Sequence, residues 1–318
     1  MDPITHGLLG AAVGQVVAQK KLGKAAAWIG AATAMCPDLD IFIRSADNPS
    51  LFLIYHRHFT HALIFSPVIA AIITLVFIVL FKKLRAKWVY VFLAALIATP
   101  THGLLDSATS YGTLLWWPLT HERIYWDLIS IVDPIFTGML FLGVVISYFW
   151  QKRVPVVVAL CLCGGYLGFA YHQHARALAV QQELAQSRHQ VIEKNRVMPK
   201  FGHLFAYSSI YIYDHHIYVD NIKTPLFQAA YATEHNSMGL FAAKNLPVSI
   251  QNDPILLKDF QVFSWFSDGY VAAISNHPLV LTDVRYLKSL DPIVPMWSIK
   301  FPNSKERAHV YWVRTPLR

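Results

Sequence analysis

Apolar residues are gathered into six long runs in the first half of the chain. The runs cover residues 4–18, 25–36, 62–81, 88–105, 135–150 and 154–171. The last four come close to the ~20 residues that an α-helix needs to cross a bilayer. The first two are shorter and rich in glycine and alanine, which is typical of helices that pack closely inside a bundle. The pattern predicts a mostly α fold, a polytopic membrane helical bundle of about six helices.

After residue 172 the pattern changes to that of a soluble sequence. Residues 173–200 open with a stretch rich in Ala, Gln, Glu and Arg, which predicts an exposed linker helix. Residues 204–222 alternate aromatic and polar positions around Asp214-His215, as a β-hairpin does. Residues 261–273, 296–301 and 308–313 are further strand candidates. We therefore predict a membrane-embedded helical domain at 1–172, a linker at 173–200 and a small extramembrane β-rich domain at 201–318.

Composition supports a membrane protein. The 318 residues are 55% hydrophobic and only 14% charged, whereas soluble domains carry about 25% charged residues. The net charge of +8 would suit a nucleic-acid ligand, but the basic residues cluster beside the apolar runs, where they act as topology signals. We expect no nucleic-acid partner. The three cysteines lie in or beside apolar runs, which argues against a disulfide framework.

The basic residues also predict an orientation. Nine of the twelve Lys and Arg residues in 1–172 fall into three groups, around positions 20–24, 82–87 and 152–153. These groups lie between runs one and two, three and four, and five and six, which the positive-inside rule assigns to the cytoplasm. The acidic residues of this region then lie at the opposite face. We expect a cation site facing outward from a bacterial inner membrane, with the β-rich domain on the same side.

Seven side chains able to bind a metal lie at the outer ends of the apolar runs. They are His6, Asp38, Asp40, His56, His61, His102 and Asp106. Ionisable residues at membrane depth are functional candidates. His102 and Asp106 are four residues apart and share a helical face. Nitrogen and carboxylate donors together suit zinc, manganese or iron better than magnesium or calcium.

Each of these motifs taken alone also has a structural explanation. His102 and Asp106 could form a hydrogen bond at a helix end, and Asp38 with Asp40 could cap the next helix. The histidines near residue 60 could form an interfacial patch that touches lipid phosphates, and His6 alone is more often a structural residue. The metal hypothesis depends on all of them reaching the same membrane face.

An aromatic stretch separates the fourth and fifth runs. Residues 107–134 carry Trp116, Trp117, Tyr125 and Trp126 among charged positions. Tryptophan and tyrosine are enriched where a protein meets the lipid headgroups. We expect this stretch to lie at that level and to form a lid over the site.

An ordered set of short motifs resembles a known family. The motifs are Asp2-Pro3-Ile4-Thr5-His6-Gly7, Pro37-Asp38-Leu39-Asp40, His56-Arg57-x-x-Thr60-His61, His102-x-x-x-Asp106, Tyr111-Gly112, Trp117-Pro118 and Asp133-Pro134. Over roughly residues 1–172 the chain resembles the YdjM-like family of membrane-bound, predicted metal-dependent hydrolases. That family is distantly similar to zinc-dependent phospholipase C. The resemblance implies that the seven residues are metal ligands or immediate neighbours; His58, at a position that varies in the family, is left out.

These observations favour a metal-dependent hydrolase that cleaves a phosphate ester of a lipid or lipid-linked substrate, with a metal-activated water. Arg57 would neutralise charge on phosphoryl oxygens, and Asp40 or Asp133 would take the proton of the water. The expected partners are membrane lipids and that substrate. An alternative is a non-catalytic membrane protein with a structural metal site and an external partner-binding domain. A metal transporter is disfavoured because the candidate ligands lie at the ends of the runs.

Overall fold

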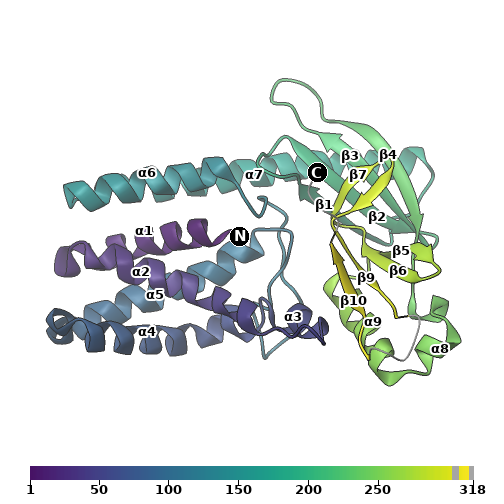
Figure 1. Ribbon diagram of the computed structural model, residues 1–318. Coiled ribbons are helices and arrows are strands. Elements are labelled where there is room, and N and C mark those ends of the chain that lie inside the picture. The colour runs from purple at the N-terminus through teal and green to yellow at the C-terminus, as the bar shows by residue number, and fades with distance from the viewer. Residues whose placement is uncertain (303–307, 315–318) are drawn as a thin grey trace. The chain divides into compact units, whose positions relative to one another are not determined.

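The computed structural model describes residues 1–302 and 308–314 (Figure 1). The chain forms two compact units, which are described separately. The first contains Met1–Asp40, Arg57–His174 and Met198–Leu204, and the second contains Ile41–His56, Ala175–Val197 and Phe205–Arg318. A short segment, residues 41–56, therefore belongs to the second unit although the chain on both sides of it belongs to the first.

Each of the six apolar runs forms a helix. These are α1 (Pro3–Leu22), α2 (Ala25–Met35), α4 (Ser66–Leu80), α5 (Trp88–Ser107), α6 (Pro134–Trp150) and α7 (Val154–Ser187). Among residues 1–302 and 308–314, three helical stretches are long and apolar enough to cross a membrane, namely Leu63–Leu80, Lys82–Ser107 and Val154–Ser187, while Pro134–Trp150 is a shorter apolar helix. The helical membrane region is thus confirmed, and the total of about six membrane helices stays a prediction.

The surface of α4 is that of a helix facing lipid. Val68, Ile72, Leu75 and Val79 are each more than half exposed, and they follow one another at the spacing of one helical face. The opposite face packs into the core that α1, α2, α4 and α5 share, which contains Ala70. These four helices lie side by side (Figure 1).

Glycines bring α1 and α2 into backbone contact. A Cβ atom on Gly10 would lie 2.3 Å from the carbonyl oxygen of Gly30, and one on Gly14 would lie 2.2 Å from that of Ala26. Small residues allow such close packing of helices in membranes. The pair is antiparallel, so the start of α1, where His6 lies, is beside the end of α2 and the 3₁₀ helix η1 (Cys36–Phe42) that follows it.

The segment that joins α5 to α6 packs against the chain near residue 60. Leu114 N donates to Arg57 O (3.1 Å) and Leu63 N donates to Leu115 O (3.0 Å). Leu114 and Leu115 are buried. The part of this stretch next to the 3₁₀ helices η2 (Phe59–His61) and η3 (Leu63–Phe65) is therefore closely packed against the chain near residue 60.

The second unit contains the predicted β-sheets. The strands β1 (Lys194–Pro199), β2 (Ala206–Tyr213), β3 (His216–Lys223) and β4 (Tyr231–Gly239) form one sheet in the order β1-β2-β3-β4. The predicted hairpin is confirmed: Tyr211 pairs with Tyr218, and Asp214 and His215 form the turn with φ of 45° and 59°. The last part of α7 packs on this sheet through Val180 and Tyr207.

A second sheet has the order β10-β9-β6-β5. Its strands are β5 (Val271–Asn276), β6 (Leu279–Asp283), β9 (Trp297–Lys300) and β10 (Tyr311–Arg314), and β7 (Leu287–Leu290) pairs with β8 (Ile293–Pro295). Short helical elements complete the unit: α3 (Ser50–Tyr55), η5 (Ala243–Asn245), α8 (Val248–Gln251) and α9 (Pro254–Phe266). The strands expected near 296–301 and 308–313 correspond to β9 and β10.

The strand expected at residues 261–273 is wrong over most of its length. Residues up to Phe266 belong to α9, and β5 begins only at Val271. Phe260, Phe263 and Phe266 are buried at a spacing of three, which is a helical period rather than a strand alternation. Asp253 starts the helix by accepting hydrogen bonds from the backbone N–H groups of residues 255 and 256.

Candidate metal centre

Four segments of the first unit bring histidines and aspartates together. His6 comes from α1, Asp38 from η1, His61 from η2, and His102 with Asp106 from α5. Two groups of three have donor atoms within 4.8 Å of one another: His6, Asp38 and His102, and His61, His102 and Asp106. The Asp38 side chain is 17% exposed, and the other four residues are fully or almost fully buried.

The backbone of α2 orients His102. Nδ1 of His102 lies 2.6 Å from the carbonyl oxygen of Ala34, so Nδ1 carries the proton and donates it. The other ring nitrogen, Nε2, therefore presents its lone pair to the interior of the cluster. A hydrogen bond from one ring nitrogen to a carbonyl or carboxylate is the usual arrangement of a histidine that binds a metal through the other.

Asp40 and Thr60 orient His61 in the same way. Nδ1 of His61 lies 3.2 Å from Asp40 Oδ2 and 3.0 Å from Thr60 Oγ1. Thr60 Oγ1 donates to Asp40 Oδ2 (3.0 Å), as does the backbone N–H of Arg57 (2.9 Å). Because Asp40 Oδ2 accepts these bonds, Nδ1 of His61 acts as a donor and its Nε2 points inward.

The two inward nitrogens face each other. His61 Nε2 and His102 Nε2 are 2.9 Å apart. If both rings were neutral, two lone pairs would point at one another, so a positive charge, either a proton or a metal ion, is needed between them. Burial lowers the pKa of His61, but its hydrogen bonds to Asp106, Asp38 and Asp40 outweigh burial and raise the pKa to about 10. The surroundings of His61 thus favour a cation.

Asp106 is the most enclosed carboxylate of the cluster. Its Oδ1 contacts the amino group of Met1 and lies 3.1 Å from His6 Nε2, and its Oδ2 lies 3.2 Å from Arg57 Nε. The Arg57 guanidinium also donates to Thr109 Oγ1 (3.3 Å). Arg57 therefore fixes the position of the Asp106 carboxylate within the cluster.

The negative charges of the cluster exceed its fixed positive charges. Three carboxylates, those of Asp38, Asp40 and Asp106, are accompanied by one guanidinium and the amino group of Met1. Burial lowers the pKa of that amino group to about 6. Burial raises the pKa of Asp38, but hydrogen bonds with His102 and His61 outweigh it and hold that pKa well below its usual range. Buried charge needs a partner, so the carboxylates need either the proton on His61 or, in its place, a bound divalent cation.

Unpaired polar atoms point to the same conclusion. His6 Nδ1 and Asp38 Oδ2 are buried and have no hydrogen-bond partner among the residues that the structure describes, and Asp106 Oδ2 makes ionic contacts with Arg57 Nε and His61 Nε2 but no hydrogen bond. A buried polar atom without a partner costs about 1–3 kcal/mol, so such atoms need an explanation. A set of imidazole nitrogens and carboxylate oxygens with orphaned atoms is the donor set of a zinc, manganese or iron site.

Some residues of the predicted set have other surroundings. His56 belongs to the second unit, where its ring stacks on Phe52 with centroids 4.8 Å apart. Asp133 Oδ1 accepts from the backbone N–H groups of residues 135 and 136 at the start of α6, and its Oδ2 accepts from Tyr166 (2.8 Å). Neither closely spaced donor group found in residues 1–302 and 308–314 includes His56, Asp133 or Asp40.

Several contributors were absent from the predicted set. The Met1 amino group, the carbonyl of Ala34 and the hydroxyl of Thr109 all contact cluster residues. Backbone groups carry no sequence signal. Thr60 belongs to a motif singled out from the sequence, and in the structure it is the partner of Asp40 and His61.

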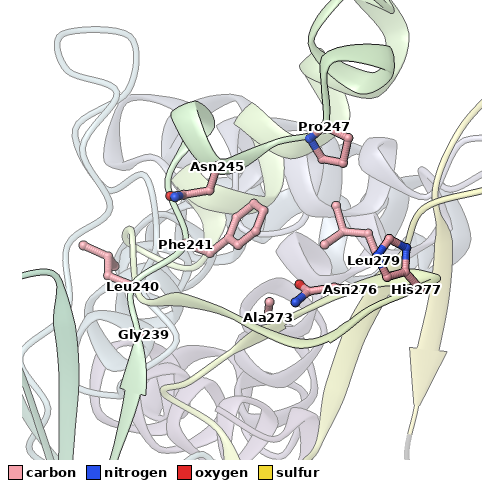
Figure 2. Close-up of a pocket in the computed structure, with 9 residues that line it drawn as sticks. All are labelled: Gly239, Leu240, Phe241, Asn245, Pro247, Ala273, Asn276, His277 and Leu279. Carbon is pink, nitrogen blue, oxygen red and sulfur yellow. The ribbon is translucent and has the colours of Figure 1, made fainter.

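A pocket in the second unit has different chemistry (Figure 2). Its volume is about 580 Å³, and Phe241 and Leu279 line it together with Asn245, Asn276 and His277. None of its nine lining residues carries a carboxylate, a guanidinium or an ammonium group. It offers no second set of metal ligands.

Comparison with known proteins identifies the family of the helical region. Residues 1–177 match the YdjM inner membrane protein family. A curated relative, the uncharacterized protein YfhP of Bacillus subtilis (strain 168), is 25% identical over 211 residues, which are 63% of this chain and 62% of that protein. No solved structure matches the chain significantly. The family match covers more than half of the chain and every residue of the cluster, and it confirms the resemblance carried by the motifs: the protein belongs to the YdjM inner membrane protein family.

Proposed function

We propose that this protein is a membrane-bound metal-dependent hydrolase that cleaves a phosphate ester in a lipid or lipid-linked substrate. The supporting observation is the buried cluster in which His61 Nε2 and His102 Nε2 face each other at 2.9 Å beside an excess of carboxylates. A divalent cation bound between these groups would accept both nitrogen lone pairs and balance the charge of the carboxylates. Zinc is our choice of metal, since mixed nitrogen and oxygen donors suit it, with manganese and iron as the competitors.

The ligands of this ion would be His6, Asp38, His61, His102 and Asp106, with Asp40 and Thr60 orienting His61. A bound divalent ion would supply a water whose pKa is lowered toward ~7 and would polarise a phosphoryl oxygen. Arg57 contacts Asp106 rather than solvent, so its task is to position that carboxylate and to add positive charge beside it. This replaces the direct phosphate contact expected from the sequence.

Asp38 would accept the proton through Oδ2, because Oδ1 is the oxygen that faces His61 and His102. It is the one member of the five that is partly exposed, and its Oδ2 has no hydrogen-bond partner among residues 1–302 and 308–314. Hydrolysis joins the water oxygen to phosphorus, breaks the bond from phosphorus to the leaving oxygen, and moves one water proton by way of Asp38 to that oxygen. Asp40 and Asp133, expected in this role from the sequence, already accept hydrogen bonds that hold the fold.

The position of the cluster supports a lipid or lipid-linked substrate. The cluster includes the last turns of α5, which lie in a candidate membrane span. A substrate that already lies in the bilayer reaches such a site more readily than a soluble one. We further propose that all six apolar helices cross or enter the membrane and that the cluster and the β-rich unit face outward. A compartment-sensitive reporter at the C-terminus checks this orientation, and a cytoplasmic signal would refute it.

The test of the function combines elemental analysis with turnover. We expect purified wild-type protein to contain about one or two equivalents of a divalent metal and to hydrolyse a phospholipid or polyprenyl phosphate ester. His102→Ala and Asp106→Ala should lose both the metal and the activity while remaining in the membrane. His121→Ala, which changes an exposed histidine of the same unit, should keep both. Activity unchanged in the first two variants would refute the assignment.

One observation favours a second function, a non-catalytic protein with a structural metal. His6, His61, His102 and Asp106 are all at most 3% exposed, and structural metal sites are closed whereas catalytic sites keep an open position. Stoichiometric metal without turnover of any phosphate ester, together with no exchange of a metal-coordinated water, would favour this second function.

A further inference from the structure

The loop between β3 and β4 carries an unusual apolar tip. Leu226 and Phe227 are 54% and 97% exposed, so Phe227 makes almost no contact with the protein. Phe205 and Tyr231 add further exposed aromatic surface at the same end of the sheet, since Ala206, Lys223 and Tyr231 are neighbours in register. Exposed apolar groups gathered in one place mark an interaction surface.

The loop is held in place rather than extended freely. Arg176, in the second half of α7, donates from Nη1 to the carbonyl oxygen of Pro225 (2.9 Å) and from Nη2 to that of Gln228 (2.6 Å). Thr224 N donates to Phe205 O (3.0 Å). The two apolar side chains thus project from a loop whose backbone is fixed on both sides to one arginine.

The position of Arg176 along α7 sets the level of the loop. The apolar part of α7, residues 154–171, is ~27 Å long at ~1.5 Å per residue, which matches the ~30 Å hydrocarbon core. Arg176 follows Tyr171 by five positions on the same helix, a rise of ~7.5 Å. The headgroup region on each side of the core is ~5–8 Å deep. Arg176 and the loop bound to it therefore reach the headgroup level.

The sheet of β1 to β4 has an apolar end at the β3–β4 loop and a polar end at the turn between β2 and β3. Farther along α7, Gln181 bonds to Ser209 Oγ (2.9 Å) and Arg188 bonds to Tyr211 Oη (2.8 Å), so the helix runs from the loop end of the sheet toward the turn at Asp214 and His215. That turn end is polar and exposed. The apolar end of the sheet is the end bonded to Arg176, which precedes Gln181 and Arg188 along the chain.

We infer that the β3–β4 loop is a membrane anchor of the second unit, with Leu226 and Phe227 inserted among the lipid headgroups and upper acyl chains. Aromatic and aliphatic side chains at such a level gain from leaving water, and the neighbouring cation of Arg176 suits the phosphate layer. The partner is the bilayer that already holds α7. This inference does not depend on the metal site.

Tryptophan fluorescence in nanodiscs tests it with the full chain. Phe227→Trp and the control Val248→Trp, which changes a 70% exposed residue on α8, each add one indole at an exposed site. Difference spectra against the wild type isolate the added emission, in phosphatidylcholine with and without bromine on the upper acyl chain. We expect most of the emission added at position 227 to be blue-shifted and lost to brominated lipid, with little loss at 248.

Equal quenching at both positions would overturn the inference. A blue shift at 227 without quenching by brominated lipid would also overturn it, because the side chain would then be buried against protein rather than lipid. A third variant, Phe227→Trp combined with Arg176→Ala, should show reduced quenching because the loop loses its fixed backbone. Quenching that persists unchanged would remove Arg176 from the proposal.

Discussion

Buried aspartates occur in both units, but the charged groups that surround them differ. In the second unit Asp220 is bound by Arg188 through two hydrogen bonds (2.7 and 3.0 Å) and by His235 Nδ1 (2.9 Å). Asp283 is likewise paired with Arg285 (2.7 Å). In the first unit Asp38, Asp40 and Asp106 share one guanidinium and one amino group, and their other close partners are ring nitrogens of His6, His61 and His102.

The comparison shows that burial alone does not identify a site. A buried aspartate with a matching cation and a full set of hydrogen bonds is accounted for by structure. An excess of carboxylates, with orphaned atoms and two facing ring nitrogens, is not accounted for without a further cation. Charge balance therefore separates the candidate metal centre from the ion pairs of the second unit.

The largest effect should come from breaking a balanced pair. Arg188→Met would leave Asp220, which is fully buried, with only the partly exposed His235 as a partner. We expect the free energy of unfolding to fall by about 3 kcal/mol, because an uncompensated buried charge is strongly destabilising. Thermal unfolding of the purified protein measures the loss. Metal content should not change; a loss of metal in this variant would contradict the comparison.

The opposite result is expected where charge is in excess. Asp38→Asn removes a carboxylate whose Oδ2 has no hydrogen-bond partner among the described residues. The unfolding free energy of the metal-free protein should fall by less than in Arg188→Met, because Asp38 is partly exposed and Asp40 and Asp106 still contact His61. Metal affinity should fall by about 100-fold or more, roughly 2.7 kcal/mol, as measured by competition with a chelator. A large loss of stability with unchanged affinity would show that Asp38 serves the fold alone.

The smallest effect is expected from a substitution that displaces His61 without altering any charge. A Cβ atom on Gly103 would lie 2.4 Å from the carbonyl oxygen of His61, so Gly103→Ala must push His61 away from α5. We expect a cost of about 1–2 kcal/mol and weaker metal binding. The matched control is Gly138→Ala in α6, where a Cβ atom meets nothing within 4 Å. That change should be neutral or stabilising by up to about 1 kcal/mol. Equal effects at both glycines would show that the close approach at Gly103 is unimportant.

The sequence was most informative where a single periodicity determines structure. The six apolar runs and the hairpin with its turn at Asp214 and His215 correspond closely to helices and strands. It was least informative where two signals compete. Residues 261–273 were expected to form a strand, but the spacing of Phe260, Phe263 and Phe266 and the cap at Asp253 produce a helix as far as Phe266.

The candidate site shows the same limit. Spacing predicted that His102 and Asp106 share a face, and the ordered motifs suggested which segments would meet. Hydrogen-bond partners could not be deduced, because they depend on how segments pack. Asp40 and Asp133 look alike in the sequence, yet Asp40 orients His61 whereas Asp133 caps α6. The carbonyl of Ala34, which sets the tautomer of His102, has no side-chain signal at all.

Residues 41–56 belong to the second unit, and this affects how the protein can be cut into fragments. Within the second unit Ser50 Oγ donates to Asp259 Oδ1 (2.5 Å), and α3 packs on α9. A fragment ending near residue 177 would retain every residue of the cluster but would leave α3 without α9. Asp40 and Arg57 would then be joined by residues 41–56 without the contacts that α9 provides. The membrane half and the β-rich half are therefore interleaved along the polypeptide, and neither can be excised by a single cut without damage to the other.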